Sequence, residues 1–449
     1  MSGREPRFTM LETVREFAGE CLAASGEGVT IRRAHARCFL ALAEHAEPEL
    51  IGPDQARWLD QLETEHDNLR AALAWAVAHE PVIAMHLVGA LWRFWWMRGY
   101  LREGRDWAEA ALRQEGGSPA ERARALHVAG DLAQEQGDYD QAVPLLTAGL
   151  QEARSAGESA IAAMCLSGLG FIARNQGGYQ AAASLHEEAL ALQRVLGDRR
   201  AVACTLGNLG SIAQNRGDVA EAEALLGEAL ATFRALGEHT MAADVAVNLA
   251  ILANQEGAHE RAARLVTEAL IVYRALSDRQ ATAIALVALA NAARGEDDRM
   301  EARALYDEAL DLYRAVDHQP GTVSVLTHLA TLSLDEGSPL QAVPLLKEGL
   351  RLLQRMDDRP AVAAALTAGA RTAAALGQWP RAGRLLGAAM AAQVGAGPPV
   401  SQRGGDVRER LIDDGIAAIG LDAWSAAVAI GRELPLELAT FDVAAIGTD

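Results

Sequence analysis

The 449-residue chain has few aromatic residues, a single lysine and no long apolar run. Aromatic side chains make up 5% of the sequence, and Lys347 stands against forty arginines. The longest apolar stretch, Val82 to Met97, contains His86 and Arg93 and is shorter than the roughly 20 residues that span a membrane. The opening residues MSGREPRFTM lack the apolar segment of a secretory signal. We therefore expect a cytoplasmic protein that does not bind membranes.

The sequence motifs of catalysis and metal binding are absent as well. No GxxxxGK[ST] loop occurs, and the lone lysine lies within the helical pattern PLLKEGL, which excludes P-loop nucleotide hydrolysis by this chain. There is no HExxH, no GxSxG and no CxxC pair among the four cysteines. The segment GLGFIA at 168–173 looks like part of a dinucleotide fingerprint, but no strand precedes it, which favours helix packing. We predict no catalytic residues, no cofactor and no metal.

The charge balance disfavours nucleic acid as a direct partner. The chain has 41 basic and 60 acidic residues and a formal charge of −19, whereas phosphate binding requires a basic face. Half of the residues are hydrophobic, which is ample for a core and argues against global disorder.

Glycines recur through the chain at one constant spacing. They are Gly137, Gly177, Gly217, Gly257, Gly337 and Gly377, with Asp297 at the vacant position. Alanine follows five residues after each position, from Ala142 to Ala382, and leucine thirteen residues after, from Leu150 to Leu350, ending at Met390. Three registers that hold over seven units indicate a tandem repeat.

Each unit has the pattern of two helices. In residues 201–237, AVACTLGNLGSIAQNRGD predicts a helix that ends near glycine, and VAEAEALLGEALATFRALG predicts a second, amphipathic helix. Small residues such as Gly210 and Ala222 allow the two helices to approach closely. Because each pair leaves an apolar face open, stacking of pairs predicts an α-solenoid with a concave groove.

The repeat resembles the tetratricopeptide repeat. Asn208-Leu209-Gly210, the turn Gly217-Asp218, Ala222 and Ala229-Leu230 carry the resemblance. It implies an all-α, right-handed superhelix of antiparallel helix pairs, with the first helix of each pair lining the groove. The period of about 40 residues exceeds the roughly 34 residues usual in that family, so the helices or turns are longer.

Segments at both ends resemble the arm of large bacterial signal-transduction ATPases. In that family an NB-ARC-like ATPase and a winged helix precede the tetratricopeptide arm, and a LuxR-type DNA-binding domain can follow it. RFTMLETVREFA at 7–18 is similar to the end of the winged helix, and EHDNLRAAL at 65–73 and LWRFWW at 91–96 are similar to the junction that follows. AGRLLG at 382–387 and GREL at 431–434 are also similar to the arm. This chain shows neither the ATPase nor the DNA-binding domain, so the resemblance implies an ATPase partner in cis or in trans.

These patterns predict four regions. Residues 1–30 resemble the end of a winged helix, and residues 31–80 form an N-terminal helical adaptor. Residues 81–393 form the solenoid of about eight hairpins. Residues 394–449 contain a Gly/Pro linker and a C-terminal helical cap.

Polar residues recur at positions where the resemblance places the groove. Amides donate and accept hydrogen bonds, which suits an extended peptide or a polar effector, although amides near a helix end can also cap carbonyls. The groove candidates are Arg174, Asn175, Asn208, Gln214, Asn215, Asn248, Asn254, Gln255, Asn291, Arg294 and His328.

Aromatic residues are concentrated in the first quarter of the chain. The candidates for a docking surface, for an ATPase domain or a ligand, are Trp92, Trp95, Trp96, Tyr100 and Trp107. Trp95 and Trp96 are adjacent and cannot share one helix face. The alternative is that the cluster packs the N-terminal helices against the first repeat.

Together these observations predict a non-catalytic recognition module. We expect a peptide, a protein partner or a small effector to bind in the groove and regulate transcription through an ATPase regulator. The alternatives are a stand-alone scaffold or ligand-binding accessory protein without an ATPase and, more remotely, an enzyme whose active site is the groove.

Overall fold

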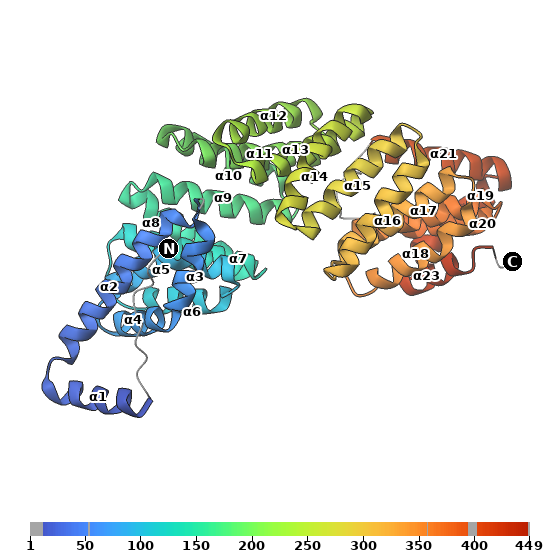
Figure 1. Ribbon diagram of the computed structural model, residues 1–449. Coiled ribbons are helices and arrows are strands. Elements are labelled where there is room, and N and C mark those ends of the chain that lie inside the picture. The colour runs from blue at the N-terminus through green and yellow to red at the C-terminus, as the bar shows by residue number, and fades with distance from the viewer. Residues whose placement is uncertain (1–11, 53, 357, 394–401, 448–449) are drawn as a thin grey trace. The chain divides into compact units, whose positions relative to one another are not determined.

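The computed structural model describes residues 12–52, 54–356, 358–393 and 402–447 (Figure 1). Every regular element in these ranges is an α-helix. The chain divides into two compact units: Met1–Gln176 with Gln180–Gly197, here the N-terminal unit, and Gly177–Tyr179 with Asp198–Asp449, here the C-terminal unit.

The N-terminal unit begins with a group of helices and continues as helix pairs. Its helices are α1 (Glu12–Ser25), α2 (Gly28–Glu49), α3 (Gln55–Thr64), α4 (His66–His79), α5 (Pro81–Arg98), α6 (Leu101–Leu112), α7 (Pro119–Glu135), α8 (Tyr139–Ala156), α9 (Ser159–Asn175) and α10 (Tyr179–Leu196). Helices α2, α4 and α5 pack together around an aromatic and aliphatic core that includes Phe94 and Trp95. The pairs α5–α6, α7–α8 and α9–α10 follow in chain order.

The C-terminal unit contains five helix pairs and three further helices. Its helices are α11 (Arg199–Arg216), α12 (Val219–Leu236), α13 (His239–Glu256), α14 (His259–Leu276), α15 (Arg279–Gly295), α16 (Arg299–Ala315), α17 (Gln319–Asp335), α18 (Pro339–Leu353), α19 (Arg359–Ala375), α20 (Trp379–Gln393), α21 (Gln402–Ile419), α22 (Leu421–Arg432) and α23 (Leu436–Ala444). The predicted all-α stack of antiparallel helix pairs is confirmed.

The repeated residues occupy equivalent places in each pair. All seven alanines of the register from Ala142 to Ala382 have no exposed surface, as expected of small residues between packed helices. The recurring glycines adopt positive φ at the turn, as at Gly217 with φ 84°. Asp297, which replaces the missing glycine, keeps the same left-handed turn at φ 64°. The turn geometry is therefore retained where the glycine is lost.

The last three helices pack on the final pair. Gly387 of α20 and Gly431 of α22 allow the two helix backbones to touch: a Cβ on Gly431 would lie 1.9 Å from the Arg384 carbonyl oxygen. Helix α23 is held by Asp442, whose carboxylate accepts hydrogen bonds from Arg384 Nε at 2.7 Å and Nη2 at 2.8 Å. Arg381 also reaches Asp442, at 3.4 Å, and donates to the Ala445 carbonyl at 2.8 Å.

None of the described helices is long and apolar enough to cross a membrane.

Candidate functional site

The helix contacts show which side of each unit is concave. First helices of consecutive pairs pack against one another: α7 on α9 in the N-terminal unit, and α13 on α15 and α17 on α19 in the C-terminal unit. Among the described residues, second helices of consecutive pairs do not approach this closely. Each unit therefore curves with its first helices on the inside, and we call these the inner helices and their partners the outer helices.

Outer helices are linked through long charged side chains. An arginine near the end of one outer helix pairs with a glutamate on the next outer helix. These pairs are Arg154–Glu188 in the N-terminal unit and Arg234–Glu268, Arg274–Glu308 and Arg314–Glu348 in the C-terminal unit. We call them the outer ladder.

Several of the predicted groove amides connect or stabilise neighbouring helices. Asn254 Nδ2 donates to the Ala288 carbonyl of the next inner helix at 2.8 Å, and Asn215 Nδ2 donates to Ser211 O of its own helix at 2.9 Å. Asn175 Nδ2 donates to the Tyr139 hydroxyl at 3.0 Å. Gln214 Nε2 lies 3.5 Å from Gln255 Oε1 on the adjacent inner helix. Part of the hydrogen-bonding capacity of this register is thus used within the protein.

The second predicted column contains Asn208, Asn248 and His328. Asn208 on α11 and Asn248 on α13 are half-buried at equivalent positions of consecutive repeats. His328 on α17 is also half-buried, and its ring stacks on Tyr306 with centroids 5.4 Å apart. Burial, with a contribution from the charge of Arg294, lowers the pKa of His328 to about 4. This imidazole is therefore neutral at pH 7.

Tyr306 joins two of the predicted residues into one cluster. It lies on the outer helix α16 in a register that is otherwise mostly leucine, and it reaches back to the inner helices. Its hydroxyl donates to Asn291 Oδ1 at 2.6 Å. Burial raises the pKa of Tyr306 to about 12, so the hydroxyl is protonated and can donate.

A charged group spans three consecutive inner helices beside this cluster. Arg294 Nε of α15 lies 3.7 Å from Asp335 Oδ2 of α17, and Arg371 Nη2 of α19 lies 3.6 Å from Asp335 Oδ1. We call this group the Arg294–Asp335–Arg371 bridge. The sequence predicted Arg294 but not its two partners. Their registers could have indicated them, because Arg371 occupies the register of Asn291 and Asp335 occupies that of Gln255, each two repeats later.

The N-terminal unit presents a different inner face. The Arg174 guanidinium lies over the Phe171 ring on α9, 5.0 Å from its centroid, and the Arg93 guanidinium lies 4.5 Å from the Trp92 ring centroid on α5. Between them α7 carries Asp131, and burial raises the pKa of its carboxyl to about 6 against the opposing charge of Arg93.

The predicted docking aromatics separate into buried and accessible residues. Trp95 is 1% exposed and belongs to the core, so it does not contribute to a docking surface, whereas Trp96 beside it is 44% exposed. Trp92, Tyr100 and Trp107 are half-buried.

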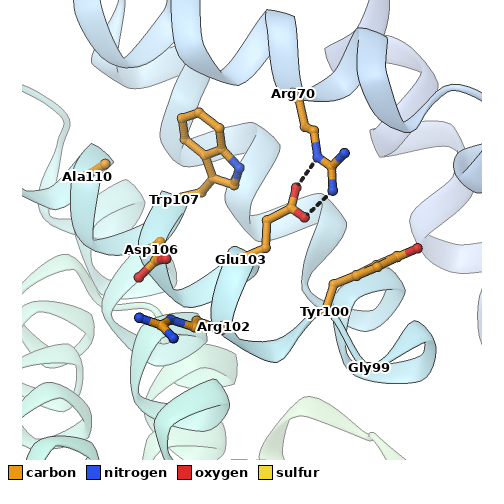
Figure 2. Close-up of a pocket in the computed structure, with 8 residues that line it drawn as sticks. All are labelled: Arg70, Gly99, Tyr100, Arg102, Glu103, Asp106, Trp107 and Ala110. Carbon is orange, nitrogen blue, oxygen red and sulfur yellow. Dashed lines mark hydrogen bonds and ion pairs between the residues drawn. The ribbon is translucent and has the colours of Figure 1, made fainter.

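Tyr100 and Trp107 line an open pocket of about 610 Å³ between α4 and α6 (Figure 2). Arg70 and Glu103 form a two-pronged ion pair in this pocket, at 2.7 and 2.6 Å, and Arg102 and Asp106 lie at its edge. The hydrogen bond from Arg70 lowers the pKa of Glu103. Because the two charges compensate each other, the pocket has no dominant charge for a ligand to recognise.

Among the described residues, no group of histidine, cysteine and acidic side chains is arranged to hold a metal ion.

The tetratricopeptide-repeat profile matches residues 106–194, 201–275 and 281–355. These segments cover more than half of the chain. The chain belongs to the tetratricopeptide repeat family. The match agrees with the helix pairs seen in both units and confirms the predicted solenoid class.

Curated relatives match a shorter segment. HTH-type transcriptional regulator Rv0890c of Mycobacterium tuberculosis (strain ATCC 25618 / H37Rv) is 37% identical over 126 residues. A regulator of Mycobacterium bovis (strain ATCC BAA-935 / AF2122/97), Mb0914c, matches to the same extent. The aligned segment is 27% of this chain and 14% of each relative, so the chain spans a small part of their length.

Solved structures share the fold at low sequence identity. A Rap protein in complex with Competence and Sporulation Factor has a TM-score of 0.57 and 14% identity, covering 80% of this chain and 98% of that one. The tetratricopeptide-sensor STAND protein PH0952 from Pyrococcus horikoshii has a TM-score of 0.54 and 14% identity, covering 76% and 52%. The Rap conjugation gene regulator of plasmid pLS20, solved with the Phr* peptide, has a TM-score of 0.51 and 13% identity, covering 85% and 98%.

Proposed function

We propose that this chain is a non-catalytic recognition module that binds a peptide or a protein segment along its inner helices. The observation that carries the proposal is the position of accessible polar side chains on consecutive inner helices. Asn208 and Asn248 repeat at one place on α11 and α13, and the Arg294–Asp335–Arg371 bridge continues across α15, α17 and α19. Side chains at a regular spacing along a curved face suit an extended ligand.

The structural neighbours support a peptide as the ligand. Two of them, both Rap proteins, were solved with a bound factor or peptide, and each is covered almost completely by this fold. A peptide also fits the chemistry of the inner face, because amide side chains can donate to and accept from a peptide backbone at once.

We further propose that binding regulates transcription through a signal-transduction ATPase in cis or in trans. The HTH-type regulators that share a segment with this chain and the STAND protein with a tetratricopeptide sensor support this assignment. The mechanism would be a difference in affinity: a ligand that prefers one arrangement of the arm and the ATPase shifts the equilibrium toward it. The alternative remains a stand-alone scaffold or a ligand-binding accessory protein.

A peptide selection tests the recognition proposal. A phage-displayed library of random twelve-residue peptides is panned on the immobilised chain and, in parallel, on the double variant Asn208→Ala/Asn248→Ala. The control is Gln341→Ala, which removes an exposed amide from the outer helix α18. We expect enriched peptides with the wild type and the control, and at least tenfold weaker binding to the double variant with unchanged helical circular dichroism. Peptides that bind all three proteins equally would place recognition elsewhere.

The size of the protein in its source cells tests the link to an ATPase. An antibody against this chain detects a band far above 47.6 kDa if the chain is the arm of a longer regulator. A band at 47.6 kDa excludes an ATPase in cis, and the question then becomes whether the chain alters nucleotide hydrolysis by a separate NB-ARC-like protein.

A further inference from the structure

The Arg294–Asp335–Arg371 bridge has more positive than negative charge. One carboxylate lies between two guanidinium groups, at 3.7 and 3.6 Å, which is longer than a charge-assisted hydrogen bond. Each guanidinium has five N–H donors, and a single carboxylate cannot use those of both arginines. The bridge therefore retains a net charge of +1 and unused donors on the concave face of a chain whose overall charge is −19.

A second group in the same unit has the same composition and a different geometry. Arg381, Arg384 and Asp442 also place two arginines around one aspartate, but Arg384 makes two hydrogen bonds of 2.7 and 2.8 Å. In that group Arg381 and Asp442 are 10% and 16% exposed and Arg384 is 28% exposed, whereas Arg294, Asp335 and Arg371 are 32%, 32% and 30% exposed. The Arg381–Arg384–Asp442 group is closed by short hydrogen bonds and fastens α23, whereas the bridge has longer contacts around a half-buried aspartate.

The neighbours of the bridge do not neutralise its excess charge. Arg294 also hydrogen-bonds to Tyr306, which is protonated, and His328 beside it is neutral, so neither adds a negative charge. Glu336, which follows Asp335 in the sequence, is paired with Arg303. Arg299 adds a further guanidinium, which donates to the backbone carbonyl of Asp335 and pairs with Asp297.

We propose that Arg294 and Arg371 bind a carboxylate group of an acidic peptide segment, and that Asp335 is an internal competitor for the same two arginines. The inference rests on the proposed function, because it names the chemistry of the peptide that the inner helices recognise. Asp335 itself demonstrates the fit: its carboxylate already spans the distance between the two guanidinium groups. A ligand carboxylate that approaches from solvent can take the donors that Asp335 leaves unused.

Asp335 then determines how acidic a segment must be in order to bind. Its negative charge lowers the local potential that an acidic ligand meets, so a weakly acidic segment is not retained. Substitution by the neutral, isosteric asparagine would leave both arginines in place and raise the positive charge from +1 to +2. The inference therefore predicts that removal of Asp335's charge strengthens binding, which is opposite to the effect expected for a residue that merely supports the fold.

Fluorescence polarisation with defined peptide pools tests this inference. Three labelled nine-residue pools share randomised flanks and differ at three central positions, which are Asp/Glu, Asn/Gln or Lys/Arg. We expect the acidic pool to bind the wild type about tenfold more tightly than the amide pool, with an affinity that falls as salt increases. Arg294→Gln/Arg371→Gln should reduce acidic-pool binding to the amide-pool level, and Asp335→Asn should tighten it about threefold or more.

Matched controls place the same charge changes on the outer ladder. Arg274→Gln/Arg314→Gln removes two positive charges, and Glu348→Gln removes one negative charge, on outer helices of the same unit. Neither control should alter binding of the acidic pool, and circular dichroism should be unchanged in all variants. An equal response to the ladder variants would mean that the effect comes from net charge and would overturn the assignment.

The outcomes separate the inference from the proposed function. If the amide or basic pool binds best and is lost on Asn208→Ala/Asn248→Ala, recognition by the inner face stands and the carboxylate assignment is wrong. If Asp335→Asn weakens acidic-pool binding, Asp335 supports the site and does not compete for it. If no pool binds the wild type, both proposals fail.

Discussion

Replacement of glycine by alanine should have opposite effects on stability at two positions, Gly431 and Gly227. Gly431 on α22 and Gly227 on α12 are both helical, so alanine gains roughly 1 kcal/mol of helix propensity at each. At Gly227 nothing lies within 4 Å of the new Cβ, and the gain should be realised. At Gly431 the new Cβ would lie 1.9 Å from the Arg384 carbonyl oxygen and 2.8 Å from its Cα.

The backbone contact determines the magnitude at Gly431. A Cβ atom cannot remain closer than about 3 Å to these atoms, so α22 must move away from α20 by roughly 1 Å or more. Overpacking typically costs about 1–3 kcal/mol, and we place this site at the upper end, about 2–3 kcal/mol or more, because a backbone obstacle cannot turn aside as a side chain does. After subtraction of the propensity gain, we expect Gly431→Ala to lose about 1–2 kcal/mol or more, and Gly227→Ala to gain about 0.5–1 kcal/mol.

Urea unfolding followed by circular dichroism gives the overall stability of each variant. Because stacked repeats can unfold in parts, hydrogen exchange of peptides from α20 and α22 locates the change. Exchange there should accelerate in Gly431→Ala and stay unchanged in Gly227→Ala. A Gly431→Ala protein that is as stable as the wild type, with normal exchange in both helices, would refute the argument from backbone contact.

Two further predictions concern a buried histidine and the fastening of α23. Both ring nitrogens of His186 are buried without a hydrogen-bond partner among the described residues, and burial lowers its pKa to about 4. His186→Leu, which introduces the residue found at Leu146 and Leu226, should therefore raise the free energy of unfolding at pH 7 by about 1–2 kcal/mol. The unfolded histidine takes up a proton near pH 6.5 and the folded one near 4, so the wild type loses stability as pH falls through this interval. Urea titrations at pH 7 and 5 should show a larger advantage for the variant at pH 5, and an equal or smaller one would contradict the assignment. Asp442→Ala should leave Arg381 and Arg384 without their shared carboxylate and loosen α23, with about 2 kcal/mol less protection from hydrogen exchange in that helix. Glu348→Ala on the outer ladder is the control and should change the hydrogen-exchange protection of its own helix, α18, by less than about 1 kcal/mol. Equal effects of the two substitutions would mean that burial of the ion pair is unimportant.

The repeat could be predicted from sequence because its determinants are local and recur. The alanine register from Ala142 to Ala382 marks an equivalent position on the second helix of every pair, and all seven residues are fully buried. The turn at Asp297 shows the limit of the glycine pattern, since aspartate adopts the same positive φ there. Glycine at this position in six units thus predicts the left-handed turn of the seventh unit, although that unit has Asp297 in its place.

The candidate site was predictable only in part, because its geometry depends on neighbouring repeats. The amide registers identified positions on the inner helices. Whether Asn254 stays free for a ligand or donates to the Ala288 carbonyl depends on the adjacent helix, which its own repeat does not specify. Asp335 and Arg371 stand in different registers, so their convergence on Arg294 follows from stacking and not from any one repeat. Adjacent Trp95 and Trp96 were expected to face different ways, which is confirmed, but the pattern could not say which of them is buried.

The outer ladder has a mechanical consequence for each unit. Inner helices touch directly, so that side of the curve resists compression, whereas the Arg–Glu pairs on the other side are exposed links that salt weakens. Each unit therefore has one side held by direct helix packing and one side linked by weak, salt-sensitive ion pairs. Because exposed ion pairs contribute little energy, the packed inner helices fix the curvature, and with it the spacing of side chains along the concave face, and both should change little as ionic strength rises or a ladder pair is removed.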